Sequence, residues 1–198
     1  MATEYINEQT RISYVDVPAI LGGTMVALAI SLILAHFGAT LGLAASYEVE
    51  RTGTTAIVAI MVSGLYMLWV QVMASMAGGY LAGRMRRPVA GASAHERDIR
   101  DGAHGLIVWA TGTVAVTIAV ALVAAFAALV PEIDITPVVP ETERTQDMID
   151  TERNTAIILA FITASVSLVS GVVSWWAATK GGDHRDNAVD HSHYVKFR

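Results

Sequence analysis

Residues 78–88 read GGYLAGRMRRP, a run of small residues that ends on three arginines and a proline. The first of these arginines closes a long charge-free window, because no Asp, Glu, Lys or Arg occurs between residues 52 and 83. That window exceeds the roughly 20 residues needed to cross a hydrocarbon core of about 30 Å. The stretch therefore predicts the end of a membrane-spanning helix, which Pro88 prevents from continuing.

The same pattern occurs three more times in the chain. Further charge-free windows cover residues 17–47, 102–130 and 154–179. The composition is 54% hydrophobic and 16% charged, against about 25% charged residues in soluble globular domains. We therefore expect an all-α polytopic membrane protein, a four-transmembrane-helix bundle that forms a single membrane domain over residues 1–198. The expected spans are 18–44, 55–83, 105–129 and 155–179.

The amino-terminal segment lacks the pattern of a secretory signal. Residues 1–18 contain one arginine and three acids, and the apolar run that follows is too long for the hydrophobic region of a signal. We expect the first span to remain in the protein as an anchor. The chain contains no cysteine, which excludes disulfides and thiolate metal sites.

Lysine and arginine are distributed unevenly over the connecting segments. Ten of the 13 lie in residues 1–17, 84–104 and 180–198, and three lie in residues 45–54 and 130–154. The positive-inside rule places the richer side in the cytoplasm. We expect both termini to be cytoplasmic, with a cytoplasmic loop at 84–104, a cytoplasmic tail at 180–198 and a periplasmic acidic loop at 130–154. If the host is a bacterium, this topology predicts a multi-pass protein of its inner membrane.

The arginines after the second span are expected to act as an anchor. Arg84, Arg86 and Arg87 directly follow the charge-free window. At that position long cationic side chains reach anionic headgroups, at about 1 kcal/mol each. We expect these three arginines to contact lipid headgroups.

Small residues recur at every fourth position in the first and second spans. This spacing places them on one face of a helix, and such faces let helices approach closely in lipid. The predicted helix-packing residues are Gly23, Ala27, Ser31, Ala35, Ser75, Gly78, Gly79 and Gly83. Two uses remain open: packing inside the bundle, and contact with a partner subunit or a second copy.

The loop before the third span carries its own helix signals. Ser93 and Glu96 have the spacing of a capping box. Oppositely charged pairs at i,i+4 spacing are Glu96–Arg100 and Arg97–Asp101. We expect a short cytoplasmic helix here that leads into the third span, with Gly102 and Gly105 allowing a bend between them.

Few residues in this sequence could carry chemistry. The spans contain no carboxylate or basic residue, so Gln71 is expected to be an interhelical hydrogen-bond donor, and His36 has no second histidine with which to bind a metal. Weak metal candidates in the tail are His184, His191 and His193, although a solvated tail is the favoured interpretation. The acidic loop is expected to be a solvated linker that becomes helical after Glu141. We find no catalytic motif, cofactor motif or basic stripe for nucleic acid.

Two motifs carry a family resemblance. The segments GGYLAGR at 78–84 and HGLIVWA at 104–110 resemble motifs of an uncharacterised group of bacterial, often alphaproteobacterial, four-span membrane proteins. That group shares the patterns GGYxAGR and HGLxxWA. Its first span begins with a tryptophan-containing phrase, whereas this sequence has Val17 and Pro18 there. The resemblance implies an inner-membrane protein and carries over no catalytic residue.

Two functions are compatible with these observations. The first is a non-enzymatic structural or accessory subunit, which contacts the lipid bilayer and packs against other membrane-protein subunits or itself through small-residue stripes. The alternative is a small oligomeric channel or transporter with a pore lined by Gln71 and by Ser and Thr. Its polar stripe on the fourth span comprises Thr163, Ser167, Ser170 and Ser174. The sequence predicts no enzyme and no cofactor.

Overall fold

The computed structural model describes residues 14–52, 56–89, 91–129 and 146–187, and it is all-helical. Its helices are α2 (Val17–Thr52), α3 (Ala56–Met85), α4 (Ala94–Leu129) and α5 (Gln146–Asp186). Each of the four contains a segment long and apolar enough to cross a membrane. The prediction of an all-α chain with four helices that could each span a membrane is confirmed.

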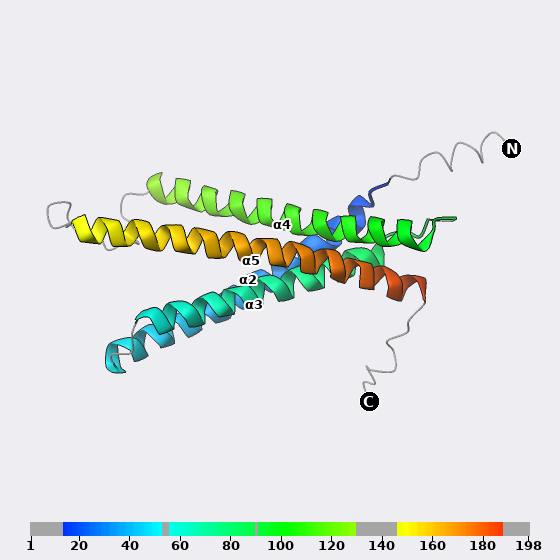
Figure 1. Cartoon of the computed structure of the whole chain (residues 1–198). Helices are drawn as coiled ribbons and strands as arrows, with labels where there is room; N and C mark the ends of the chain where they lie inside the picture. Colours follow the sequence, from blue (N-terminus) through cyan, green and yellow to red (C-terminus); the bar gives the residue numbers. More distant parts are fainter. Residues whose placement is uncertain (1–13, 53–55, 90, 130–145, 188–198) are drawn as a thin grey trace, which may run out of the picture.

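The helices form two hairpins that meet at one end and diverge at the other (Figure 1). We call the meeting point the charged end; α2 and α4 begin there, and α3 and α5 end there. The opposite end is the splayed end. Helix α3 packs against the other three helices, whereas α2 and α5 make no contact within the described residues. The hairpin of α2 and α3 stays closed further out, where the Tyr66 hydroxyl donates to the Leu34 carbonyl at 2.6 Å.

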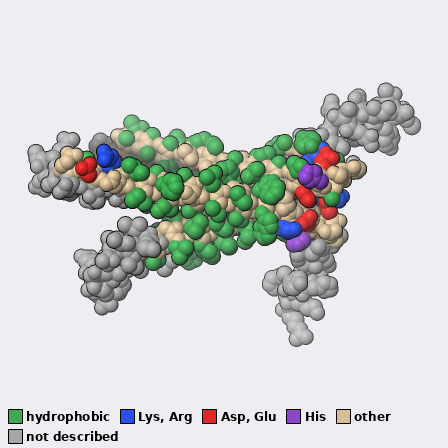
Figure 2. Space-filling view, in the orientation of Figure 1, with side chains coloured by type: hydrophobic (Ala, Val, Ile, Leu, Met, Phe, Trp, Pro, Cys, Tyr) green, Lys and Arg blue, Asp and Glu red, His purple; other side chains and the backbone are tan. Residues whose placement is uncertain are grey.

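The interior is small and partly polar, whereas the exterior is large and apolar. The buried apolar residues are mostly alanines, accompanied by Ile20, Val70 and Val108. Large side chains such as Leu122, Phe126 and Phe161 are exposed. Figure 2 shows apolar side chains along the helices and most charged side chains gathered at the charged end. This distribution suits lipid as the solvent, because close packing through small residues replaces the hydrophobic effect there.

Helix α4 begins as predicted but continues further than predicted. The Ser93 hydroxyl accepts a hydrogen bond from the Glu96 backbone N–H at 3.2 Å, which caps the helix. The expected bend is wrong, because α4 runs unbroken to Leu129. A Cβ at Gly102 would overlap the Trp175 indole, and a Cβ at Gly105 would overlap the Ser174 carbonyl. The two glycines therefore allow α5 to approach α4 and do not bend the helix.

The other helix ends differ less from expectation. Helix α3 ends at Met85, shortly before Pro88, and Gly91 begins the turn into α4 with a φ of 79°. Helix α5 continues to Asp186, past the expected span limit at 179. The helical extension expected from Glu141 is described only from Gln146 onward, and 130–145 lies outside the described residues.

Candidate functional site

Glycines bring the helix backbones into contact near the charged end. A Cβ on Gly23 would overlap the Gly78 carbonyl, and a Cβ on Gly78 would lie 2.6 Å from the Gly23 carbonyl oxygen. These two glycines join α2 to α3. The contacts that join α3 to α5 are Gly79 with Ser174 and Gly83 with Ala178. Of the two uses left open by the sequence, the structure places these four glycines inside the bundle.

The remaining members of the predicted packing set have different surroundings. Ala27 lies beside Gly78, within 2.8 Å of the position that a Cβ there would occupy. Ser31 and Ser75 line a cavity between the hairpins. Ala35 is exposed, and the packing predicted for it is not seen. The recurrence of small residues at every fourth position continues past the point where the hairpins diverge (Figure 1). The sequence pattern therefore cannot show where contact between the helices stops.

A buried ion cluster of Asp101, Arg86 and Arg185 ties three helices together at the charged end. Asp101 on α4 is 2% exposed and accepts a hydrogen bond from Nε of Arg86, the residue that directly follows α3. Arg185 on α5 binds both carboxylate oxygens, with Nη1 and Nη2 each at 3.1 Å. Arg185 Nη1 also donates to the Gly83 carbonyl at 2.7 Å. A bidentate guanidinium pair of this kind fixes geometry as well as charge.

This cluster corrects two sequence predictions. Arg86 is 3% exposed, so its predicted contact with lipid headgroups is wrong; the side chain turns inward to Asp101. Arg97 was expected to pair with Asp101, but it lies 3.4 Å from Asp186. The Asp101 carboxylate is already bound by Arg86, which directly follows α3, and by Arg185 on α5, which explains why Arg97 pairs with Asp186 instead. Of the other two predicted headgroup contacts, Arg87 is exposed and Arg84 is half-buried.

His104 holds the start of α2 against α4. It is 1% exposed. Its Nδ1 lies 2.7 Å from the Arg100 carbonyl, and its Nε2 accepts a hydrogen bond from the Asp16 backbone N–H at 2.8 Å. A neutral imidazole has one donor and one acceptor, so this arrangement requires the proton on Nδ1. The Asp16 carboxylate in turn accepts hydrogen bonds from the backbone N–H groups of Ala19, at 3.4 Å, and Arg87, at 3.0 Å.

Arg100 completes the polar packing at this end. Its Nη2 donates to Glu96 at 2.8 Å, as the predicted i,i+4 pair requires. Its guanidinium carbon also lies 3.6 Å from the centre of the Tyr14 ring, a cation–π contact. Sequence reasoning missed the buried roles of Asp101 and His104. The signal was the placement of Arg100, Asp101 and His104 within one helical turn beside a charge-free window.

Two of the candidate histidines, His184 and His36, lie in the part of the chain that the structure describes. His184 Nδ1 lies 3.0 Å from the Tyr80 hydroxyl, while His191 and His193 lie outside the described residues. The exposed His36 bonds its own helix, with Nδ1 2.7 Å from the Leu32 carbonyl. Within the part of the chain that the structure describes, no group of three or more His, Asp or Glu residues could hold a metal ion.

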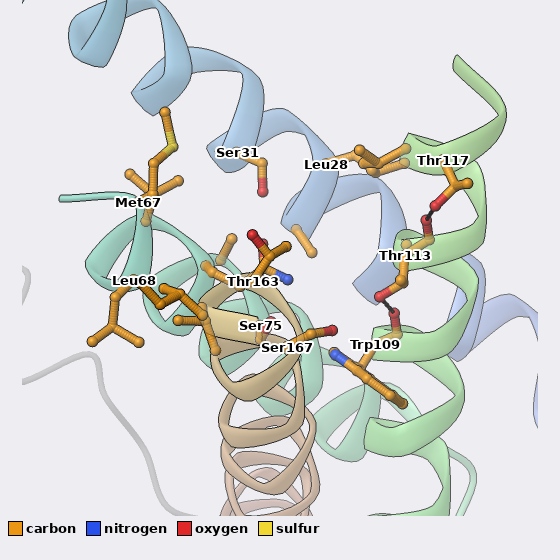
Figure 3. Close-up of a pocket in the computed structure, with 18 of the residues that line it drawn as sticks. Leu28, Ser31, Met67, Leu68, Ser75, Trp109, Thr113, Thr117, Thr163 and Ser167 are labelled. Carbon is orange, nitrogen blue, oxygen red and sulfur yellow. Dashed lines mark hydrogen bonds between the residues drawn. The ribbon is translucent and has the colours of Figure 1, made fainter. Parts of the chain in front are cut away.

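A cavity of about 740 Å³ lies between the two hairpins, with walls from all four helices (Figure 3). Most lining residues are apolar, and none is charged. The polar ones are Ser31, Gln71, Ser75, Trp109, Thr113, Thr117, Thr163 and Ser167. As expected, Gln71 makes an interhelical bond: its Nε2 donates to the Ser170 hydroxyl at 3.4 Å. Ser170 and Ser174 of the predicted polar stripe are fully buried in helix contacts and do not line the cavity.

Comparison with known proteins gives no relative. No protein-family model, curated protein or solved structure matches the chain.

Proposed function

We propose that the protein is a non-enzymatic accessory subunit of a membrane assembly, located in the inner membrane of a bacterium. The observation that carries this proposal is the exposure of the outer half of the α4–α5 hairpin. From Val116 to Leu129 every residue of α4 except Ala127 is exposed, and the same holds for α5 from Ala156 to Ser165. Helices in lipid associate chiefly through van der Waals packing and interhelical hydrogen bonds. A helix from another subunit would supply contacts that the second hairpin leaves unmade.

The stripes of small residues contribute to this proposal differently than expected. Gly78, Gly79 and Gly83 are used within the chain, so they do not offer a surface to a partner. The surface left for a partner consists of larger side chains, including Val120, Leu122 and Phe126. The family resemblance of the GGYLAGR and HGLIVWA segments supports the same placement in a bacterial inner membrane.

Photo-crosslinking tests the accessory role directly. We expect a photoreactive residue at Val120, in the outer half of α4, to form an adduct with another membrane protein in native membranes. Val172 on α5 serves as the matched control, because the two valines are 63% and 66% exposed but Val172 lies nearer the charged end. Mass spectrometry of the adducts identifies the partner. Lipid adducts alone at Val120, or the same protein adducts at both positions, would contradict the proposal.

We further propose that the charged end faces the cytoplasm, with both termini on that side. The support is the gathering of arginines there: Arg84, Arg86, Arg87, Arg97, Arg100 and Arg185 lie at this end, and Arg153 lies near the other. Burial of Arg86 in the ion cluster does not weaken this argument, because the positive-inside rule concerns the side on which the residue stays during insertion.

Reporter fusions test this orientation. Fusions at Met1 and Arg198 are expected to report the cytoplasm, and a fusion at Thr145 is expected to report the periplasm, because the Lys and Arg distribution sets the topology. Enzymatic reporters that are active on only one side of the membrane provide the measurement. A periplasmic signal from either terminus would overturn the proposed topology.

The cavity favours one alternative, a small channel or transporter. Its polar lining includes Gln71, Thr163 and Ser167, as expected for that function. A path through the bundle would have to continue past the charged end. There His104, Val108 and Asp101 are each 2% exposed or less, so they fill the interior between the cavity and the charged end. A channel would require these buried side chains to move aside and open a path. The accessory role requires no such movement, and we favour it for that reason.

A further inference from the structure

We propose that the cavity between the hairpins is a binding site for an uncharged amphiphile, a membrane-soluble molecule with a long apolar body and one compact hydrogen-bonding head. This inference goes beyond the accessory role and does not depend on a partner subunit. It rests on the charge of the lining, the position of its polar groups, and two glycines that keep the space open.

The size and lining of the cavity fit a small lipophilic molecule. Its volume of about 740 Å³ lies within the range of roughly 300–1,000 Å³ that is typical of small-molecule sites. Because no charged residue lines it, an ionised head would lose its hydration without gaining a counter-charge. Ionised groups are costly at such depths in a membrane. The lining therefore selects an uncharged head.

Polar groups line both the floor and the outer side of the cavity (Figure 3). Ser75, Ser167 and Trp109 lie at the floor, which is the side nearer the charged end, and Ser31 and Thr117 lie at the outer side. The Thr117 hydroxyl is already occupied, since it donates to the Thr113 carbonyl at 2.9 Å. We place the head of a bound amphiphile at the floor, where three polar groups lie together, and its apolar body along the outer part.

One donor at the floor has no partner in the described structure. The indole Nε1 of Trp109 is buried and makes no hydrogen bond. The ring packs on Gly171, where a Cβ would lie 3.2 Å from the ring atoms. An unpaired donor is costly inside a membrane protein. An unpaired N–H donor at the floor identifies the head of the amphiphile as a hydrogen-bond acceptor, such as a hydroxyl or carbonyl.

The glycines supply an independent argument. For nearly every glycine described within the four helices, other atoms lie within 4 Å of the position that a Cβ would occupy. Close helix packing therefore explains why glycine occurs at those positions. The exceptions are Gly64 and Gly112, which meet nothing within 4 Å, and both line the cavity. Glycine in a helix interior is less stable than alanine by about 1 kcal/mol. Packing does not account for these two residues, whereas an occupied cavity does.

Binding of matched probes tests the site. We expect delipidated protein in detergent to bind radiolabelled hexadecanol saturably, and to bind palmitate, which has the same chain but an ionised head, about tenfold or more weakly. Gly112→Leu should abolish hexadecanol binding, because a Cβ at this position meets no atom within 4 Å and the rest of the side chain would occupy the cavity. Ala110→Leu is the matched control: Ala110 is exposed on the same helix, and its variant should bind like the wild type.

The outcomes of these assays distinguish an uncharged amphiphile in the cavity from a helix of a partner protein. The thermal unfolding temperatures of both variants should be no lower than that of the wild type, which shows that Gly112→Leu does not act by disrupting the fold. The proposal fails if hexadecanol does not saturate, if palmitate binds equally well, or if Gly112→Leu binds like Ala110→Leu. It also fails if Gly112→Leu releases a copurifying protein while hexadecanol binding persists, because a partner helix would then occupy the space. Failure in these assays leaves the Val120 crosslinking result unaffected.

Discussion

Asp101→Ala is expected to destabilise the fold by about 3–5 kcal/mol, because it leaves two buried guanidinium groups without their shared carboxylate. Arg86 is 3% exposed and Arg185 is 10% exposed, so neither can recover full hydration without opening the helix contacts. Unfolding of the purified protein in detergent, followed by circular dichroism, measures the loss. At such a loss we also expect a clear fall in the amount of protein recovered from membranes.

Two variants control this experiment. Asp98→Ala removes an exposed carboxylate from the same helix, and it should leave the free energy of unfolding nearly unchanged. Replacing the whole cluster, with Arg86→Met, Asp101→Leu and Arg185→Met together, should restore most of the lost stability, because no uncompensated charge remains. Equal stability of Asp101→Ala and Asp98→Ala would mean that the ion cluster does not stabilise the fold.

Gly79→Leu is the second substitution with a large expected effect. A Cβ at this position would overlap the Ser174 carbonyl oxygen and would lie 2.7 Å from the Ser174 hydroxyl. A backbone carbonyl cannot rotate away as a side chain can, so α3 and α5 must move apart. Overpacking typically costs about 1–3 kcal/mol, and we expect Gly79→Ala within that range and Gly79→Leu above it. Detergent-resistant folding, measured beside expression level, gives the comparison.

Gly64→Leu is the matched control for this substitution. It introduces the same side chain on the same helix, but at a position where a Cβ meets no atom within 4 Å. We expect Gly64→Leu to fold like the wild type, whereas Gly79→Leu should lose the fold itself. If Gly79→Leu and Gly64→Leu were equally stable, the contact between α3 and α5 would not be the close one described.

The sequence was sufficient to predict the helices but not the angle at which the two hairpins diverge. Charge-free windows locate the four spans, because a charge is costly in hydrocarbon wherever it occurs. The spacing of Gly78, Gly79 and Gly83 correctly indicated faces suited to close approach. The same period continues to Ala35, which is exposed. The point where the two hairpins diverge depends on contacts between segments that are distant in the sequence. The recurrence of small residues along one helix contains no information about those contacts.

The ion cluster escaped prediction for a related reason. A charge at the end of a span is ordinarily solvated, and Arg86 and Asp101 were interpreted in that way. Their burial depends on Arg185, which is separated from Asp101 by 84 positions and lies beyond the expected end of the fourth span. The cavity within the bundle was not predicted, although Gln71, Thr163 and Ser167, which line it, were named as pore residues of an oligomeric channel. Its floor at Trp109 and its open wall at Gly112 required the relative placement of the two hairpins.

The connectivity of the ion cluster also sets an order for biogenesis. Arg86 belongs to the first hairpin, whereas both Asp101 and Arg185 belong to the second. Before Asp101 has been synthesised, the nascent Arg86 has no carboxylate of this cluster to bind. Insertion of α4 supplies that carboxylate, and the last turn of α5 then adds the second guanidinium. Assembly of the two hairpins is therefore completed only after translation has passed residue 185.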